Sequence, residues 1–180
     1  MGAEIINVRK EHFPSLRFVG KRYTDKDRGA DGGFGNKWNE WSQSGWFDVL
    51  EKLGPLEEVE NGSLGFMGCS DNNAFEYWIG MFFPEQTAVP EGFASIDLPE
   101  SDVGICWIKG RSDNGEIFGA EPHRMCMDKL AEHGLGQFRD NLKGNDRKWW
   151  HFFERYNCPR FTNKQPDGTV ILDYGMYLGA

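Results

Sequence analysis

One carboxylate stands inside the most aromatic run of the chain, WWHFFERY at residues 149–156. Its aromatic content favours a β-strand, on which alternate residues share a face. On such a strand Phe153 and Arg155 point away from Glu154. The residues that share its face would be Trp150, Phe152 and Tyr156. A carboxylate among aromatic rings is partly desolvated, which raises its pKa and makes it reactive or apt to bind a ligand.

Two kinds of chemistry follow for Glu154. It could neutralise a cationic ligand whose rings stack on the neighbouring aromatic side chains. It could instead act as a general base on a water molecule. A third interpretation is structural, with Glu154 at the solvent edge of its strand or paired with an arginine. The pattern of the run leaves these three open.

A second aromatic run, FEYWIGMFF, occupies residues 75–83 and also indicates a strand. One face of this strand would belong to the core and the other could line a cleft. The cleft face would consist either of Tyr77, Ile79, Met81 and Phe83 or of Glu76, Trp78 and Phe82. Trp107, in a later apolar segment, is a further candidate for an aromatic pocket wall.

Other constellations are weak. His123 and Cys126 lie three residues apart on a predicted helix, but no further His or Cys is near them in sequence, so we predict no metal site. The glycine-rich segment 29–35 precedes a helix yet lacks the Lys-Ser/Thr of a phosphate-binding loop. We expect a flexible loop that could close over the cleft, and no cofactor.

Composition limits the class of protein. The 180 residues fit one domain, and 14% of them are aromatic, which favours a thick core or an aromatic-lined pocket. The net charge of -8 and the scattered basic residues argue against nucleic-acid binding. No segment has the length and apolar character of a membrane span or a signal peptide, and the four cysteines show no disulfide spacing, so a cytoplasmic location is expected.

The elements that position these residues form two similar halves, approximately residues 1–90 and 91–180. Each half is predicted to have the order strand–helix–strand–strand. The first half is predicted as Leu16–Tyr23, a helix over Asn36–Leu53, then Leu64–Cys69 and Phe75–Phe83. The second is predicted as Val103–Lys109, a helix over Pro122–His133, then Trp150–Tyr156 and Val170–Leu178. Gly92–Leu98 is expected to be an extended lead-in, Ser70–Asn73 a hairpin turn and Leu135–Lys148 an irregular insertion. The expected fold is α+β: an antiparallel sheet with helices packed on it, pseudo-twofold symmetry and a central cleft.

Four stretches give the sequence a family resemblance: PSLRFVG at 14–20, residues 75–81, residues 103–110 ending in Lys-Gly, and FERY at 153–156 followed by 170–178. In this order and spacing the chain resembles the GyrI-like family, the effector-binding domain of AraC- and MerR-type regulators such as BmrR and Rob. The resemblance implies the tandem fold with a central cleft over the whole chain.

The resemblance also implies site residues. Glu154 matches the buried glutamate that meets cationic, aromatic drugs in multidrug-sensing members. The aromatic wall would map onto Tyr77, Trp107 and Tyr156, and with them Phe83 and Tyr174. The regulators carry a DNA-binding domain before this one, whereas here the likeness begins near Met1, so either a stand-alone member or a piece of a longer chain is expected. The closing residues 174–177, YGMY, also differ from the family's usual Ile/Tyr-Pro ending.

Three hypotheses from different classes follow. The first is a module that binds hydrophobic, often cationic aromatic molecules with Glu154 as counter-charge. The second is a hydrolase with Glu154 as catalytic base on strained, electrophilic aromatic compounds, as in some stand-alone relatives. The third is a protein-interaction role toward a separate regulator or a topoisomerase. A monomer and a dimer are both compatible with the sequence.

Overall fold

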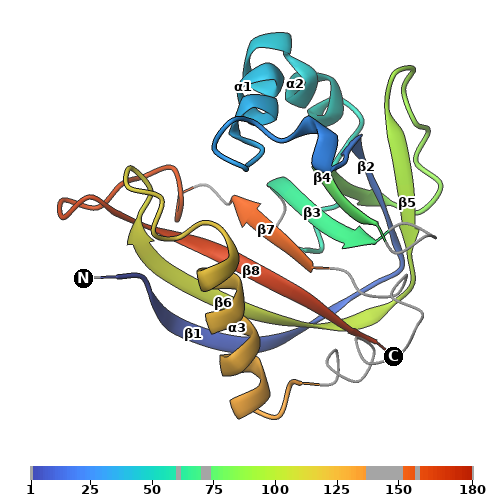
Figure 1. Ribbon diagram of the computed structural model, residues 1–180. Helices are drawn as coiled ribbons and strands as arrows, with labels where there is room; N and C mark the ends of the chain where they lie inside the picture. The colour runs from blue at the N-terminus through green and yellow to red at the C-terminus, as the bar shows by residue number, and fades with distance from the viewer. Residues whose placement is uncertain (1, 60–61, 70–73, 137–151, 157–158, 180) are drawn as a thin grey trace.

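The computed structural model describes residues 2–59, 62–69, 74–136, 152–156 and 159–179. They form one antiparallel sheet of eight strands with three α-helices and a short 3₁₀ helix (Figure 1). The strands are β1 (Glu4–Phe13), β2 (Leu16–Tyr23), β3 (Ser63–Cys69), β4 (Phe75–Pro84), β5 (Ala94–Leu98), β6 (Ser101–Arg111), β7 (Phe152–Tyr156) and β8 (Thr169–Gly179). The helices are η1 (Asp25–Asp27), α1 (Gly35–Ser44), α2 (Trp46–Glu51) and α3 (Ala120–Glu132). The α+β class and the antiparallel sheet expected from the sequence are confirmed.

The order of the strands is symmetric. It reads β1-β6-β8-β7-β3-β4-β2-β5, and exchanging β1–β4 with β5–β8 reproduces the same order from the other edge. The symmetry point lies between β3 and β7, where Gly65 pairs with Glu154. The first strand of each half therefore pairs with a strand of the other half: β1 pairs with β6, and β5 pairs with β2.

The three α-helices all contribute to the same one of the two apolar cores. Figure 1 shows α1 and α2 over one end of the sheet and α3 over the other, with β3 and β7 between them. Trp41 and Leu50 from the first pair and Cys126 and Leu130 from α3 join strand residues in this helix-side core. None of the described helices is long and apolar enough to cross a membrane.

The other core contains no helical residue among those described and lies on the opposite sheet face; we call it the helix-free core. Its centre is aromatic. Phe13 of β1 lies 5.8 Å from Phe82 of β4 and 6.0 Å from Phe153 of β7, measured between ring centroids. Because β1 and β4 are not neighbours in the sheet, these contacts show that the sheet curls and packs against itself.

Two parts of the predicted secondary structure need correction. The predicted helix over Asn36–Leu53 is two helices, because Gly45 adopts the left-handed conformation (φ 72°) that ends α1 before α2 begins. Each half also gains a strand. β1 was not predicted, and the lead-in at Gly92–Leu98 contains β5. The predicted turn at Ser70–Asn73, residues 150–151 of the predicted strand Trp150–Tyr156 and most of the predicted insertion lie outside the described residues.

Gly175 of β8 allows a close contact in the helix-free core. It pairs with Phe153, and a Cβ at position 175 would lie 2.2 Å from Cζ of that ring. Phe153 is fully buried and cannot move away without displacing its neighbours. We expect Gly175→Ala to destabilise the fold by about 1–3 kcal/mol through overpacking. Urea denaturation would measure this loss as a lower free energy of unfolding. The added cost should shrink when Phe153 is first replaced by Leu; an equal cost in both backgrounds would contradict the proposed clash.

Candidate ligand-binding site around Glu154

Glu154 lies at the centre of the sheet, on the strand next to the symmetry point. Its partner across β3 is Gly65 and its partner across β8 is Tyr174. Residues paired in this way share a sheet face, so Glu154 projects from the helix-covered face. Only 9% of its surface is exposed.

Tyr156 and Tyr77 surround the carboxylate with hydrogen-bonding rings. The Tyr156 hydroxyl donates a short hydrogen bond to Oε2 of Glu154. Trp38 of α1 connects the two tyrosines: its Nε1 donates to the Tyr77 hydroxyl at 2.9 Å, and its ring meets Tyr156 edge-on at 4.8 Å. Gly65 makes room for this arrangement, since a Cβ there would lie 2.4 Å from the Tyr77 hydroxyl.

Further rings complete the surroundings. Tyr156 packs against Phe161 at 4.8 Å and Phe118 at 6.5 Å. The His123 ring of α3 stacks on Phe152 at 4.0 Å. Tyr174 is buried, and its hydroxyl donates to the carbonyl of Ile117 at 3.0 Å. We call Glu154, Tyr156, Tyr77, Tyr174 and Trp38 the Glu154 site.

Burial controls the protonation of these groups. It raises the pKa of Glu154 to about 7, although the hydrogen bond from Tyr156 acts in the opposite direction. Burial, followed by the charge of Glu154, holds the pKa of Tyr77 and Tyr174 well above the usual range, so both hydroxyls stay neutral. Burial lowers the pKa of His123 to about 4, which keeps its ring neutral as well. The site therefore has one group, Glu154, that changes charge near neutral pH.

Asp173 has the cationic partners that Glu154 lacks among the described residues. Asp173 is fully buried on the opposite face of the sheet, and two guanidinium groups compensate its charge. Arg155 lies 2.8 Å and Arg160 2.9 Å from Asp173 Oδ2. Within the described part of the chain, Glu154 has no lysine or arginine partner, only the Tyr156 hydroxyl. A buried carboxylate without a cation is costly and attracts one.

The structure brings together four of the six predicted ligand-binding residues: Glu154, Tyr156, Tyr77 and Tyr174. It also decides between the two faces of β4, because Tyr77, Ile79, Met81 and Phe83 share the helix-covered face with Glu154. Phe83 is on that face but lies six residues along β4 from Tyr77, fully buried in the helix-side core.

Trp107 does not join the Glu154 site. It pairs with Asp173, and its ring packs on the helix-free core. The guanidinium groups of Arg9 and Arg160 lie over the ring at 4.7 and 4.4 Å from its centroid. This placement puts Trp107 on the opposite sheet face from Glu154.

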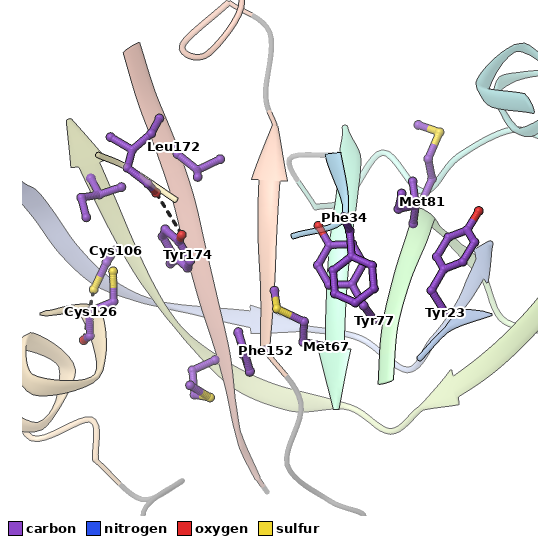
Figure 2. Close-up of a cluster of buried hydrophobic side chains, with 14 of the residues drawn as sticks. Tyr23, Phe34, Met67, Tyr77, Met81, Cys106, Cys126, Phe152, Leu172 and Tyr174 are labelled. Carbon is purple, nitrogen blue, oxygen red and sulfur yellow. Dashed lines mark hydrogen bonds between the residues drawn. The ribbon is translucent and has the colours of Figure 1, made fainter. Parts of the chain in front are cut away.

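Sequence reasoning missed the residues that complete the aromatic surroundings: Trp38, Phe34, Phe118 and Phe161. Trp38 precedes the apolar stripe of the predicted helix, and that periodicity cannot show which strand the ring will meet. Phe34 stands in the glycine-rich segment, where it stacks on Tyr77 (Figure 2). Phe118 and Phe161 lie in connections, for which hydrophobic periodicity gives no signal.

Comparisons with known proteins support the fold. No protein-family model and no curated protein sequence matches the chain. A solved protein from Staphylococcus aureus MU50, named for a role in bacterial transcription regulation, aligns over 97% of this chain and 99% of its own at 20% identity and a TM-score of 0.54. The protein SAV2435, solved with tetraphenylphosphonium bound, aligns over 96% of this chain and 93% of its own at 20% identity and a TM-score of 0.57. Both neighbours therefore share this fold over nearly the whole chain.

Proposed function

We propose that this chain is an effector-binding domain of the GyrI-like type. Its ligands are hydrophobic aromatic molecules, often cationic, bound over Glu154. The observation that carries the proposal is the buried carboxylate enclosed by aromatic rings, without a described cationic partner. A ligand cation would compensate the charge, and its aromatic groups would replace the rings that now cover it.

The neighbour SAV2435 supports this ligand class. Tetraphenylphosphonium, which that protein binds, carries one positive charge shielded by four phenyl groups. Such a cation is weakly hydrated, so it loses little on leaving water, whereas Glu154 gains a counter-charge. Apolar burial of about 25 cal/mol per Å² would supply most of the affinity, and the carboxylate would select for charge.

Isothermal titration calorimetry with tetraphenylphosphonium and the neutral triphenylphosphine oxide tests the proposal. At pH 8 we expect Glu154→Gln to weaken binding of the cation about 10- to 100-fold and leave the neutral compound within about twofold, since only the cation uses the carboxylate. Wild type should bind the cation about tenfold more tightly at pH 8 than at pH 6. The reason is that a pKa of about 7 leaves only roughly a tenth of Glu154 ionised at pH 6.

Glu76→Gln is a matched control for this titration. Glu76 is on β4, paired with Arg22, and its side chain belongs to the opposite sheet face. Its replacement should change neither the affinity for the cation nor the dependence on pH. If the cation binds equally well to wild type and Glu154→Gln at both pH values, Glu154 is not the counter-charge. If neither compound binds, the site is not an aromatic-ligand site.

The pKa of Glu154 favours a second candidate function, hydrolysis. A carboxylate with a pKa of about 7 suits a general base at neutral pH. It would take a proton from water while the water oxygen bonds to an electrophilic cyclopropane carbon of a strained aromatic compound. The strained C–C bond to that carbon breaks, its electron pair passes into the conjugated aromatic system, and Glu154 returns the proton to the anion so formed. Mass spectrometry of incubated mixtures distinguishes the candidates. A product heavier by one water that forms with wild type and not with Glu154→Gln, which still binds, would identify a hydrolase.

A further inference from the structure

Phe34 covers one face of Tyr77 in the manner of a bound aromatic ring. The two ring centroids are 4.3 Å apart and the planes are inclined by only 4°, and Figure 2 shows one ring lying over the other. Aromatic pairs inside proteins usually prefer edge-to-face or offset arrangements. Phe34 comes from outside the sheet and is only 7% exposed, so it occupies a place that Tyr77 would otherwise offer to another ring.

A cation accompanies this ring. The guanidinium of Arg28 lies over Phe34, 4.7 Å from the ring centroid, and also over Phe75 at 5.2 Å. Arg28 is partly exposed and forms an ion pair with Asp25 at 2.8 Å. The segment from Arg28 to Phe34 thus places an aromatic ring on Tyr77 and a positive charge over that ring. Tyr77 in turn lies close enough to Glu154 for the charge of the carboxylate to raise its pKa.

The segment 28–34 is joined to the start of α1, where the Phe34 carbonyl accepts hydrogen bonds from Lys37 N at 2.9 Å and from Trp38 N at 3.1 Å. Hydrogen bonds within it join Gly29 N to Gly33 O and Gly32 N to Gly29 O, and Arg28 Nη1 donates to Gly32 O. A Cβ at Gly32 or at Gly35 would meet no heavy atom within 4 Å. With its carbonyl held at α1, the Phe34 side chain could turn away from Tyr77 at the cost of its contacts with Tyr77, Phe75 and Arg28.

We propose that the face of Tyr77 covered by Phe34 is the ring-binding subsite of the Glu154 site, and that a cationic aromatic ligand enters by displacing Phe34 together with Arg28. The internal pair has the chemistry of the ligand, a ring with a positive charge next to it, and therefore competes with it. This inference rests on the proposed function. It adds that the ligand must present a flat aromatic ring on the side nearest its charge.

An internal competitor lowers the apparent affinity for a ligand in proportion to the fraction of molecules in which the subsite is free. Removing the competing ring should strengthen binding by the factor that its stacking supplies, about 3- to 10-fold. A ring that merely lines the pocket would behave in the opposite way, because its removal takes away contact area.

Calorimetric titration of tetraphenylphosphonium into wild type, Phe34→Ala, Phe34→Leu and Phe161→Ala at pH 8 tests the inference. We expect Phe34→Ala to bind about 3- to 10-fold more tightly than wild type and Phe34→Leu to fall between them, since leucine fills space without stacking. Phe161 is the control: it packs on Tyr156 from another connection, and Phe161→Ala should give no gain. Thermal unfolding shows that each variant is folded at the temperature of titration.

The outcomes separate this inference from the proposed function. If wild type binds and both Phe34 variants bind equally well or more weakly, Phe34 is a pocket wall and the inference is overturned, while the proposed function stands. If neither wild type nor any Phe34 variant binds, both fail. Binding by the Phe34 variants alone would support both, with the competitor stronger than expected.

Discussion

At pH 8, Glu154→Gln should be more stable than the wild type by about 3 kcal/mol. Burial raises the pKa of Glu154 from 4.5 to about 7 in the folded protein, so the folded state binds the proton more tightly than the unfolded state does. Stability should therefore fall as pH rises from about 4.5 to 7 and stay low above that range, by about 1.4 kcal/mol per unit of pKa shift. Glutamine has the same shape, carries no charge, and its carbonyl oxygen can accept the Tyr156 hydrogen bond.

Urea denaturation at pH 5 and pH 8 measures this difference. At pH 5 both folded proteins are neutral at position 154, and the gain should fall below about 1 kcal/mol. Glu76→Gln, which removes an ion-paired carboxylate, should show no such gain at pH 8. A Glu154→Gln protein that is less stable than wild type at pH 8 would mean that the native state compensates the charge. The expected result is a trade-off in which the ligand-binding group reduces the stability of the empty protein.

Asp173→Asn should cost about 3–5 kcal/mol of stability. The change removes the charge that compensates Arg155, whose side chain is fully buried, and Arg160. Glu11 lies 3.3 Å from Arg155, but it already pairs with Arg9 at 2.8 Å. Removing one partner from a buried ion-pair network leaves an uncompensated charge in the interior, which is the costly case.

The matched control for Asp173 is a carboxylate at the surface. Asp97 is exposed and pairs with Arg17 at 2.7 Å, so Asp97→Asn should cost less than about 1 kcal/mol. Chemical denaturation at pH 7 compares the two variants. If Asp173→Asn loses no more stability than Asp97→Asn, water or a rearranged Glu11 must compensate the charge of Arg155. The network would then contribute little to stability.

The strands with strong hydrophobic patterns were predictable, and the elements shaped by tertiary contacts were not. β2, β3, β4, β6 and β8 appear within a few residues of their predicted bounds because their apolar side chains face two cores. β1 escaped prediction because its sequence, EIINVRKEHF, is largely polar, as is common for an edge strand. The break at Gly45 was not predicted because a glycine within a helical pattern ends the helix only when the next helix packs in a new direction.

The same distinction applies to the site. Glu154 and Tyr156 could be placed together from their spacing on one strand, and strand alternation correctly put Phe153 and Arg155 on the other face. The pairing of β7 with β3 and β8 brings in Tyr77 and Tyr174, and no local pattern encodes that register. Trp107 is separated from Glu154 for the same reason, because β6 pairs with β8 so that Cys106, not Trp107, faces the same way as Tyr174.

The exchange of first strands between the two halves has a consequence for how the chain acquires its structure. Glu4 pairs with Lys109, so β1 leaves the ribosome long before β6, its neighbour in the described sheet, is made. β1 must therefore remain unpaired until β6 has been synthesised, and pairing between residues so distant in sequence makes folding slow. The charged residues of β1, Arg9 to Glu11, would protect the waiting strand from pairing with other chains. Because each half also lacks an outer strand that only the other supplies, the nascent domain should gain its resistance to proteolysis late and in one step.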